Sequence, residues 1–186
     1  ADFLDTLYDL TEGNPFFIEE VLKSLIMTGD LFYTRGKWER KPLDEIHIPR
    51  TVQVAVQQRA ARLTAEASHV LTLAAVAGRR FDFGLLQHLT QQDEKALLDL
   101  MRELMTAQLV VEETADIFAF RHALTRQAVY AELLVRERRA LHRSIAEALE
   151  QLYPEGAARS GQLADLAYHA YEGEQWEAAF EYARRA

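Results

Sequence analysis

The fold is decided by the stretch Leu109-Val110-Val111-Glu112-Glu113-Thr114-Ala115-Asp116-Ile117-Phe118-Ala119-Phe120. Its two ends are short apolar runs rich in β-branched and aromatic residues, and the polar residues between them suit a tight connection. The stretch therefore predicts a β-hairpin, in a chain whose other segments mostly have helical spacing.

Three helices are expected before this hairpin. Residues 64–77 are apolar nearly all round, with Thr64 as a good N-cap, and so predict a central helix. A short helix is expected at 81–89, and a longer one at 91–108 with a clear core face. Three helices followed by a hairpin are the element order of a winged helix. We place this domain at residues 49–150, which also include a helix from Thr51 that precedes the three and two helices after the hairpin.

Residues 1–48 predict a smaller, lid-like unit. The run Thr11-Glu12-Gly13-Asn14-Pro15 separates two amphipathic helices, since it supplies a glycine stop, an Asn cap and a proline suited to a first helical turn. After Gly29, residues 31–40 alternate around Gly36 and predict a second short hairpin. Residues 41–48 are expected to form a polar connector.

Residues 151–186 predict the start of a TPR-like superhelix. Pro154-Glu155-Gly156 breaks the chain, and two helices, at 162–171 and 175–186, then flank Gly173. One helical hairpin cannot bury its own face, so we expect more repeats beyond Ala186. The predicted fold class is thus mainly α, with a lid, a winged helix and a first repeat.

Composition excludes several classes of protein. The net charge of −8 is not that of a general nucleic-acid binder, and the lack of cysteine excludes disulfides and thiol chemistry and fits a reducing cytoplasm. No apolar run approaches the roughly 20 residues of a membrane-spanning helix. Because the chain lacks an initiating Met and opens on a helical pattern, we expect it to be a fragment.

Motifs of catalysis are missing from the sequence. It contains no P-loop, G-x-G-x-x-G, G-x-S-x-G or H-E-x-x-H pattern, so the fragment is not expected to be an enzyme. The six histidines are isolated along the chain and read as surface or capping residues, so no metal ligand is predicted.

One segment, residues 121–143, is locally basic, with a charge of +4. Two interpretations remain open: ion pairing with the acidic first third of the chain, or contact with phosphate groups. Readout of DNA would require basic or amide side chains on the third helix of the winged helix, whereas most of the charged residues in 91–108 are acidic. We therefore do not expect this domain to read DNA.

The ordered series of motifs resembles the region after the ATPase core of STAND-class signalling ATPases, especially the large ATP-binding LuxR-type transcriptional regulators. The run Gly13-Asn14-Pro15-Phe16-Phe17 is similar to the start of a helix in the family's lid. Residues 48–51 and 74–81 are similar to the opening of its winged helix. Residues 120–124 carry the F-x-H-x-L pattern that follows its wing. The resemblance covers almost all of the chain.

This resemblance implies roles for four residues. In the family, ATP or ADP binds between an upstream P-loop domain, the lid and the winged helix. Pro15, in a turn shaped by Gly13 and Asn14, would approach the adenine side, and His122 would meet the β-phosphate of ADP. The alternatives are a simple helix cap at residues 13–15 and, for His122, a histidine at a strand end whose ring is satisfied by the backbone.

The expected function is therefore that of a regulatory module that cannot hydrolyse ATP alone. Its implied partners are the upstream nucleotide-binding domain and the downstream repeats of the same chain, and a homo-oligomer of the full-length protein. Two alternatives stay open: a winged-helix DNA binder that uses residues 121–143, and a protein-interaction scaffold with no link to nucleotides.

Overall fold

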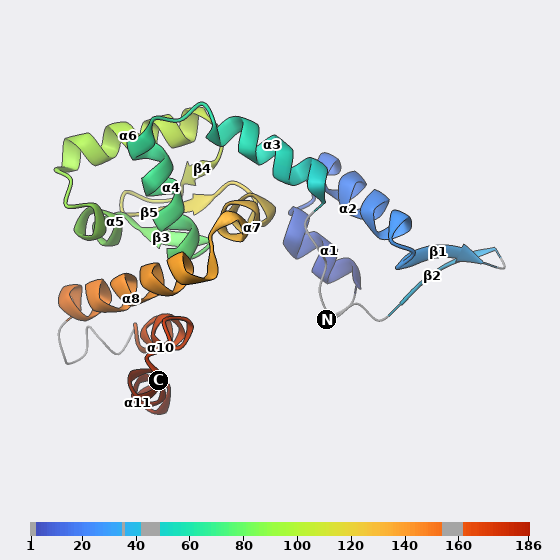
Figure 1. Cartoon of the computed structure of the whole chain (residues 1–186). Coiled ribbons are helices and arrows are strands. Elements are labelled where there is room, and N and C mark those ends of the chain that lie inside the picture. Colours follow the sequence, from blue (N-terminus) through green and yellow to red (C-terminus); the bar gives the residue numbers. More distant parts are fainter. Residues whose placement is uncertain (1–2, 35, 42–48, 154–161) are drawn as a thin grey trace.

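The structure, a computed structural model, describes residues 3–34, 36–41, 49–153 and 162–186. The chain is mainly helical, with two small antiparallel sheets, as the sequence predicts. In chain order, the elements are α1 (Phe3–Thr11), α2 (Pro15–Met27), β1 (Leu31–Thr34), β2 (Lys37–Arg40), α3 (Arg50–Ala60), α4 (Ala65–Ala77), β3 (Arg80–Asp82), α5 (Phe83–Thr90), α6 (Glu94–Thr106), β4 (Val110–Glu112), β5 (Ile117–Phe120), α7 (Ala123–Glu132), α8 (Val135–Leu152), α10 (Leu163–Glu172) and α11 (Trp176–Arg185) (Figure 1).

The centre of the molecule has the element order of a winged helix. Helices α4, α5 and α6 precede the hairpin β4–β5, and β5 pairs with both β4 and β3, giving the strand order β3-β5-β4. The hairpin that the sequence predicts at residues 109–120 is thus confirmed, as part of a three-stranded sheet.

Strand β3 corrects the predicted helix at residues 81–89. Phe81 pairs with Phe118 in the sheet and is buried, so the chain is extended here. Helix α5 begins only at Phe83, where the side chain of Asp82 accepts a hydrogen bond of 3.0 Å from the Leu85 amide. A three-residue strand is too short to show a period of two in the sequence.

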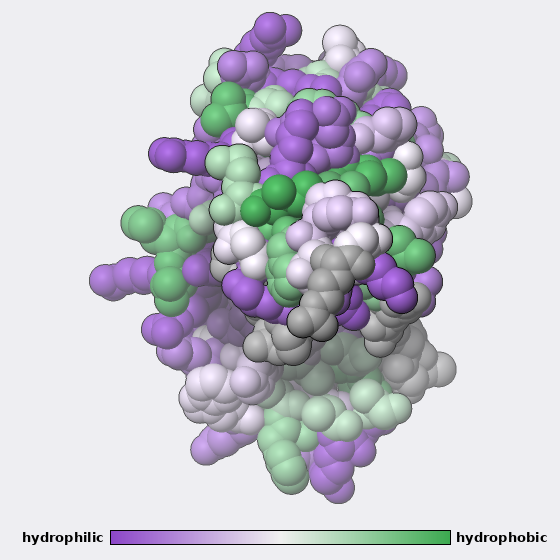
Figure 2. All heavy atoms as spheres, turned by 90° about the vertical axis from the view of Figure 1, so that its right-hand side faces the viewer, coloured by the Kyte–Doolittle hydropathy of each residue, from purple (hydrophilic) through white to green (hydrophobic). Residues whose placement is uncertain are grey.

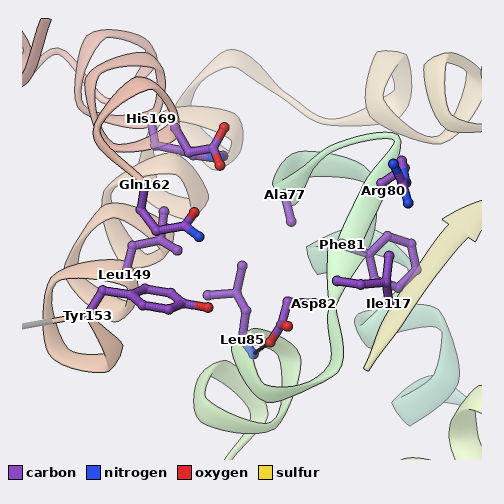
Figure 3. A pocket seen from close by; sticks show the side chains of 11 residues that line it. Ala77, Arg80, Phe81, Asp82, Leu85, Ile117, Leu149, Tyr153, Gln162 and His169 are labelled. Carbon is purple, nitrogen blue, oxygen red and sulfur yellow. Dashed lines mark hydrogen bonds between the residues drawn. The ribbon is translucent and has the colours of Figure 1, made fainter. Parts of the chain in front are cut away.

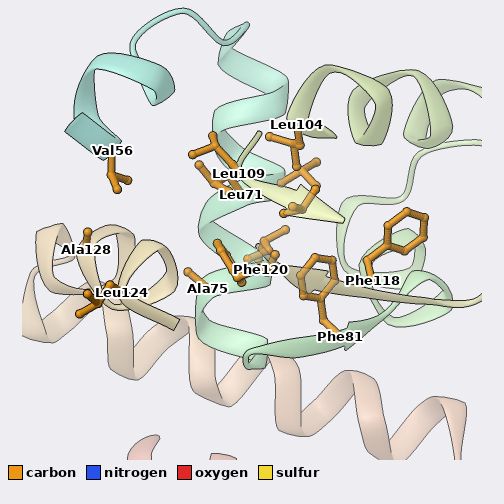
Figure 4. Packing of buried hydrophobic residues seen from close by; sticks show 14 of the residues in the cluster. Val56, Leu71, Ala75, Phe81, Leu104, Leu109, Phe118, Phe120, Leu124 and Ala128 are labelled. Atoms are coloured by element: carbon orange, nitrogen blue, oxygen red, sulfur yellow. The ribbon is translucent and has the colours of Figure 1, made fainter. Parts of the chain in front are cut away.

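Helix α4 is the central helix of the winged helix. Its N-cap is Thr64, whose side chain accepts a hydrogen bond from the Ala67 amide, and Gly78 ends it with a positive φ of 151°. It buries seven side chains, because α5, α6, α7, α8 and β3 all pack against it. Figure 4 shows Leu71 and Ala75 of this helix among Leu104, Phe118 and Phe120.

The lid helices share this core. Buried side chains of α1 and α2 belong to the same hydrophobic cluster as those of α3, α4, α6, α7 and the sheet; the lid contributes Leu7, Phe17, Val21 and Leu25. Helices α8, α10 and α11 form a second cluster, to which α4 and α5 contribute Val76 and Leu85. Helix α4 therefore contacts both clusters.

The domain limits stay predictions. Apart from Lys41, the connector at 41–48 lies outside the described residues, as does the break at Pro154-Glu155-Gly156. Helix α8 crosses the predicted limit at residue 150 and packs on α10. No described helix has the length and apolar character that crossing a bilayer requires.

The second predicted hairpin is also confirmed, as β1–β2 with Gly36 at a φ of 81°. It projects from the lid, far from the winged helix (Figure 1). Apolar side chains lie exposed on this end of the molecule, where green atoms interrupt the polar surface in Figure 2. The large side chains that the lid and its hairpin expose include Phe16, Met27, Tyr33 and Trp38.

Candidate functional site

Asn14 and His122, 108 positions apart in sequence, lie side by side in the structure. Asn14 precedes α2, and His122 precedes α7. The Asn14 Nδ2 atom lies 3.2 Å from the His122 Nε2 atom. Two of the four residues singled out by sequence therefore meet at the junction of the lid and the winged helix.

The turn before α2 explains how Asn14 is placed. Glu12 and Gly13 both have left-handed backbones, with φ values of 52° and 72°. Asn14 then caps α2 by accepting a hydrogen bond of 3.0 Å from the Phe16 amide, and Pro15 occupies the first turn. The interpretation of this motif as a helix cap is thus confirmed, and the cap leaves the Asn14 side chain free to reach His122.

The cap also fixes the protonation of His122. Because the Asn14 Oδ1 atom accepts from the Phe16 amide, the Nδ2 group is the one that faces His122, and it can only donate. The His122 Nε2 atom must then accept, so a neutral ring carries its proton on Nδ1. Asn14 therefore selects one tautomer of the imidazole.

Nδ1 of His122 is the unusual atom of this site. It is buried and has no hydrogen-bond partner among the described residues, although Glu12 Oε2 lies 3.5 Å away. The expectation of a ring satisfied by the backbone is thus wrong, since both nitrogens face side chains. The ring is held edge-on against Phe17, with 5.0 Å between ring centroids. A buried nitrogen without a full hydrogen bond calls for an explanation in a folded protein, and Glu12 is the nearest group that can interact with it.

The groups around His122 shift its pKa in opposite directions. Burial lowers the pKa of His122, the Glu12 carboxylate acts in the opposite direction, and the guanidinium groups of Arg121 and Arg59 lower it further. Glu12 is itself held in an ion pair by Arg79, which follows the end of α4. At neutral pH the lowered pKa leaves the imidazole uncharged.

A pocket of about 240 Å³ opens beside this pair. The exposed residues Arg59 and Arg121 bring two cations to it, from α3 and from the end of β5. Neither arginine was assigned to the site by sequence, although Arg121 opens the basic segment. The full lining is Asn14, Phe16, Phe17, Ala55, Val56, Arg59, Gln108, Arg121 and His122.

Gly13 and Pro15 are placed differently from Asn14. Both are exposed and neither lines the pocket; Gly13 supplies the turn, and Pro15 supplies the first residue of α2. The side chains of Asn14, His122 and the two arginines meet at the pocket, and the arginines supply its cationic donors. Guanidinium groups with a neighbouring imidazole and amide are donors that suit phosphate oxygens.

Three other arginines of the basic segment have partners that the sequence did not predict. Arg126 Nε donates to the Ala75 carbonyl at 2.8 Å, Arg143 Nε donates to the Gly173 carbonyl at 2.5 Å, and Arg139 lies 2.9 Å from Glu174. The predicted pairing of these arginines with the acidic first third of the chain is wrong. They bind instead to α4 and to the turn between α10 and α11.

Two histidines depart from the expected surface or capping positions. His142 and His169 are buried, and their Nδ1 atoms lie 2.9 Å apart. No cluster of three or more His, Cys, Asp or Glu residues suited to a metal ion occurs in the described part of the chain.

In comparison with known proteins, no family model and no curated protein matches the sequence.

Proposed function

We propose that this chain is the regulatory part of an ATP-dependent, signal-transducing transcriptional regulator. In this proposal it couples the nucleotide state of an upstream P-loop domain of the same chain to downstream helical repeats. The observation that carries the proposal is the pocket at which Asn14, His122, Arg59 and Arg121 converge between the lid and the winged helix.

The donor set of this pocket supports binding of a phosphorylated ligand. Two guanidinium groups give it a local positive charge within a chain of net charge −8. Its volume of about 240 Å³ is smaller than the ~300–1,000 Å³ that enclose a whole small ligand. It therefore suits part of a nucleotide, with the remaining contacts supplied by another domain. Among the described residues no ion-pair partner is found for Arg59 or Arg121, and the phosphate groups of bound ADP or ATP would supply that charge.

His122 gives the pocket a way to respond to an anion. In the present arrangement its Nε2 atom accepts from Asn14, and the ring is neutral. An anion beside Nε2 would displace the Asn14 amide from that atom and favour a second proton there, while the Nδ1 proton stays directed toward Glu12. His122 would then bridge Glu12 and the anion as an imidazolium, and binding would take up a proton.

The chain itself can be tested with inorganic pyrophosphate. We expect pyrophosphate to raise the pKa of His122 in an NMR titration and to bind more tightly as the pH falls from 7.5 to 6. Arg59→Ala and Arg121→Ala should each weaken binding about tenfold, since a charge-assisted hydrogen bond contributes about 1.5–3 kcal/mol. The matched control is Arg62→Ala, an exposed arginine near Arg59 that does not line the pocket. Equal weakening by all three variants would contradict the proposal.

Nucleotide retention is the test in the protein that carries the upstream domain. There His122→Ala is expected to weaken ADP retention about 10- to 100-fold and to raise basal output, because it removes a donor to a charged group. His69→Ala, at an exposed position of α4, is the control. Unchanged ADP occupancy, or a coding frame that begins near Ala1 with no P-loop upstream, would refute the assignment. Salt-dependent binding of the fragment to duplex DNA would support the DNA-binding alternative instead.

A further inference from the structure

A second cavity lies where the winged helix meets the hairpin of α10 and α11. Its volume is about 340 Å³, and it lies between β3 and α5 on one side and α8 and α10 on the other. Pockets that hold a whole small ligand have volumes of ~300–1,000 Å³. This space, which we call the junction cavity, is therefore large enough for a complete small molecule, unlike the pocket of about 240 Å³ beside His122.

Part of the wall of the junction cavity is apolar. Figure 3 shows Leu149 on the side of α8, with Phe81 and Ile117 across the cavity from it. An apolar group that covers such a wall is stabilised by the hydrophobic effect, since it removes apolar surface from water. The apolar side chains that line the cavity are Ala77, Phe81, Leu85, Ile117 and Leu149.

The polar part of the wall carries two carboxylates, one from each side. Asp82 is the last residue of β3, and Asp165 lies in the first turn of α10. Burial raises the pKa of the Tyr153 phenol, and the charges of Asp82 and Asp165 raise it further. Figure 3 shows Tyr153, which follows α8, extending across the cavity toward Leu85 and Asp82. Both carboxylates therefore act on the space around one hydroxyl group.

Cations of the protein do not neutralise these carboxylates. Among the described residues, no ion-pair partner is found for Asp82 or Asp165. Arg80 also lines the cavity, but its guanidinium group lies 2.6 Å from the Glu113 carboxylate. His169 is neutral at pH 7, because burial lowers its pKa to about 3. The cavity therefore has a surplus of negative charge, which attracts a cation and repels an anion.

Asp82 is held in place before any ligand arrives. Its Oδ1 atom caps α5 by accepting a hydrogen bond of 3.0 Å from the Leu85 amide. A carboxylate accepts hydrogen bonds through both oxygens, and no donor to Oδ2 is found among the described residues. Because the cap already fixes the side chain, an ammonium group that binds to Oδ2 loses little free energy to ordering it.

We propose that the junction cavity binds a small organic cation, whose ammonium group lies between Asp82 and Asp165 and whose apolar body covers the apolar wall. A metal ion fits less well, because a hydrated ion gains nothing from apolar side chains and no cluster of three or more suitable ligands occurs in the described part of the chain. The organic ligand contacts β3 and α5 as well as α8 and α10, so it stabilises the position of α10 on the winged helix. The inference does not depend on nucleotide binding.

Three indole compounds of nearly equal size test the preference for a cation. Tryptamine carries an ammonium group, tryptophol a neutral hydroxyl group and indole-3-propionate a carboxylate. In NMR titrations of the unmodified chain, we expect tryptamine to shift the methyl signals of Leu85, Ile117 and Leu149 with a Kd of about 1 mM or lower, as a ligand of this size allows. Tryptophol should bind about tenfold more weakly, and indole-3-propionate should not bind. Absence of these shifts with millimolar tryptamine, or equal binding of tryptophol, would overturn the proposal.

Two aspartate variants test the carboxylates. Asp82→Asn removes the charge and keeps the cap of α5, since asparagine and aspartate are equally good N-caps. It should weaken tryptamine binding about tenfold. Asp165→Asn should weaken it about threefold, because Asp165 is exposed to solvent.

The matched control is Asp93→Asn, the same change at the N-cap of α6 and outside the cavity, which should leave binding unchanged. Equal affinities of the Asp82→Asn and Asp93→Asn variants for tryptamine would refute the site. Asp165→Asn, at an exposed position, decides the question if Asp82→Asn does not fold.

Amide exchange tests whether the ligand stabilises the position of α10. Tryptamine at ten times its Kd should slow the exchange of α10 amides about tenfold where exchange requires α10 to leave the winged helix. The same concentration should have much less effect in Asp82→Asn. Unchanged exchange in α10 at saturating tryptamine would refute a ligand that bridges the two units.

Discussion

Acidification is expected to destabilise this protein well above the pH at which its carboxylates titrate. Burial lowers the pKa of His142 to about 4 and that of His169 to about 3, whereas both return to about 6.5 in the unfolded chain. Between these limits the unfolded chain binds protons that the folded chain does not. The contribution of the two neutral rings to the free energy of unfolding is therefore fully present above pH 6.5. It decreases as the pH falls, by up to about 1.4 kcal/mol per pH unit for each ring.

Denaturant unfolding at a series of pH values from 7 to 5 measures this slope. The double variant His142→Gln/His169→Gln should be less stable at pH 7, yet its stability should depend much less on pH. His69→Gln removes an exposed histidine of α4 and should keep the slope of the unmodified chain. A slope that survives in the double variant would assign the acid sensitivity to other groups.

The second large effect is expected at Phe120, a large, fully buried side chain in the centre of the main core. Phe120→Ala should reduce the free energy of unfolding by about 3–5 kcal/mol, because it removes apolar burial and leaves a cavity next to Leu71 and Phe81. Phe180→Ala is the matched control: the same change on α11, where the side chain is 67% exposed, should alter stability by about 0.5 kcal/mol or less.

The same experiment tests whether the lid and the winged helix unfold together. Phe17 and Val21 of the lid lie in the hydrophobic cluster that contains Phe120. We therefore expect one transition for both, shifted as a whole by Phe120→Ala and visible in the fluorescence of Trp38 on the lid hairpin as well as in the helical signal. A lid that keeps its own, unshifted transition would show that the shared cluster does not couple the two units.

Much of the fold could be predicted from sequence signals that involve only a few neighbouring residues. The hairpin at 109–120, the cap at Asn14, the N-cap at Thr64 and the glycine turn at Gly36 were all predicted, because each is stabilised mainly by the backbone of its own segment. The three-residue strand β3 was not, since Phe81 is extended only because Phe118 lies beside it.

The candidate site was predictable in part. Asn14 and His122 were named from a resemblance, and the structure places them in contact; the resemblance offered no account of the tautomer or of the unpartnered Nδ1 atom. The contribution of Arg59 to the pocket has no sequence signal, because an arginine on the polar face of an amphipathic helix looks like a solvated charge.

The sequence by itself determined the kinds of element, their order and most of their ends, since spacing and capping act within one or two turns of a helix. Only the tertiary structure decided which histidines are buried. His142 and His169, 27 positions apart, read as isolated surface residues until α8 and α10 pack and bring their rings to 2.9 Å. The burial, the hydrogen-bond partners and the protonation of the two histidines follow from that packing, because they depend on groups contributed by α4, α7, α8 and α10 together.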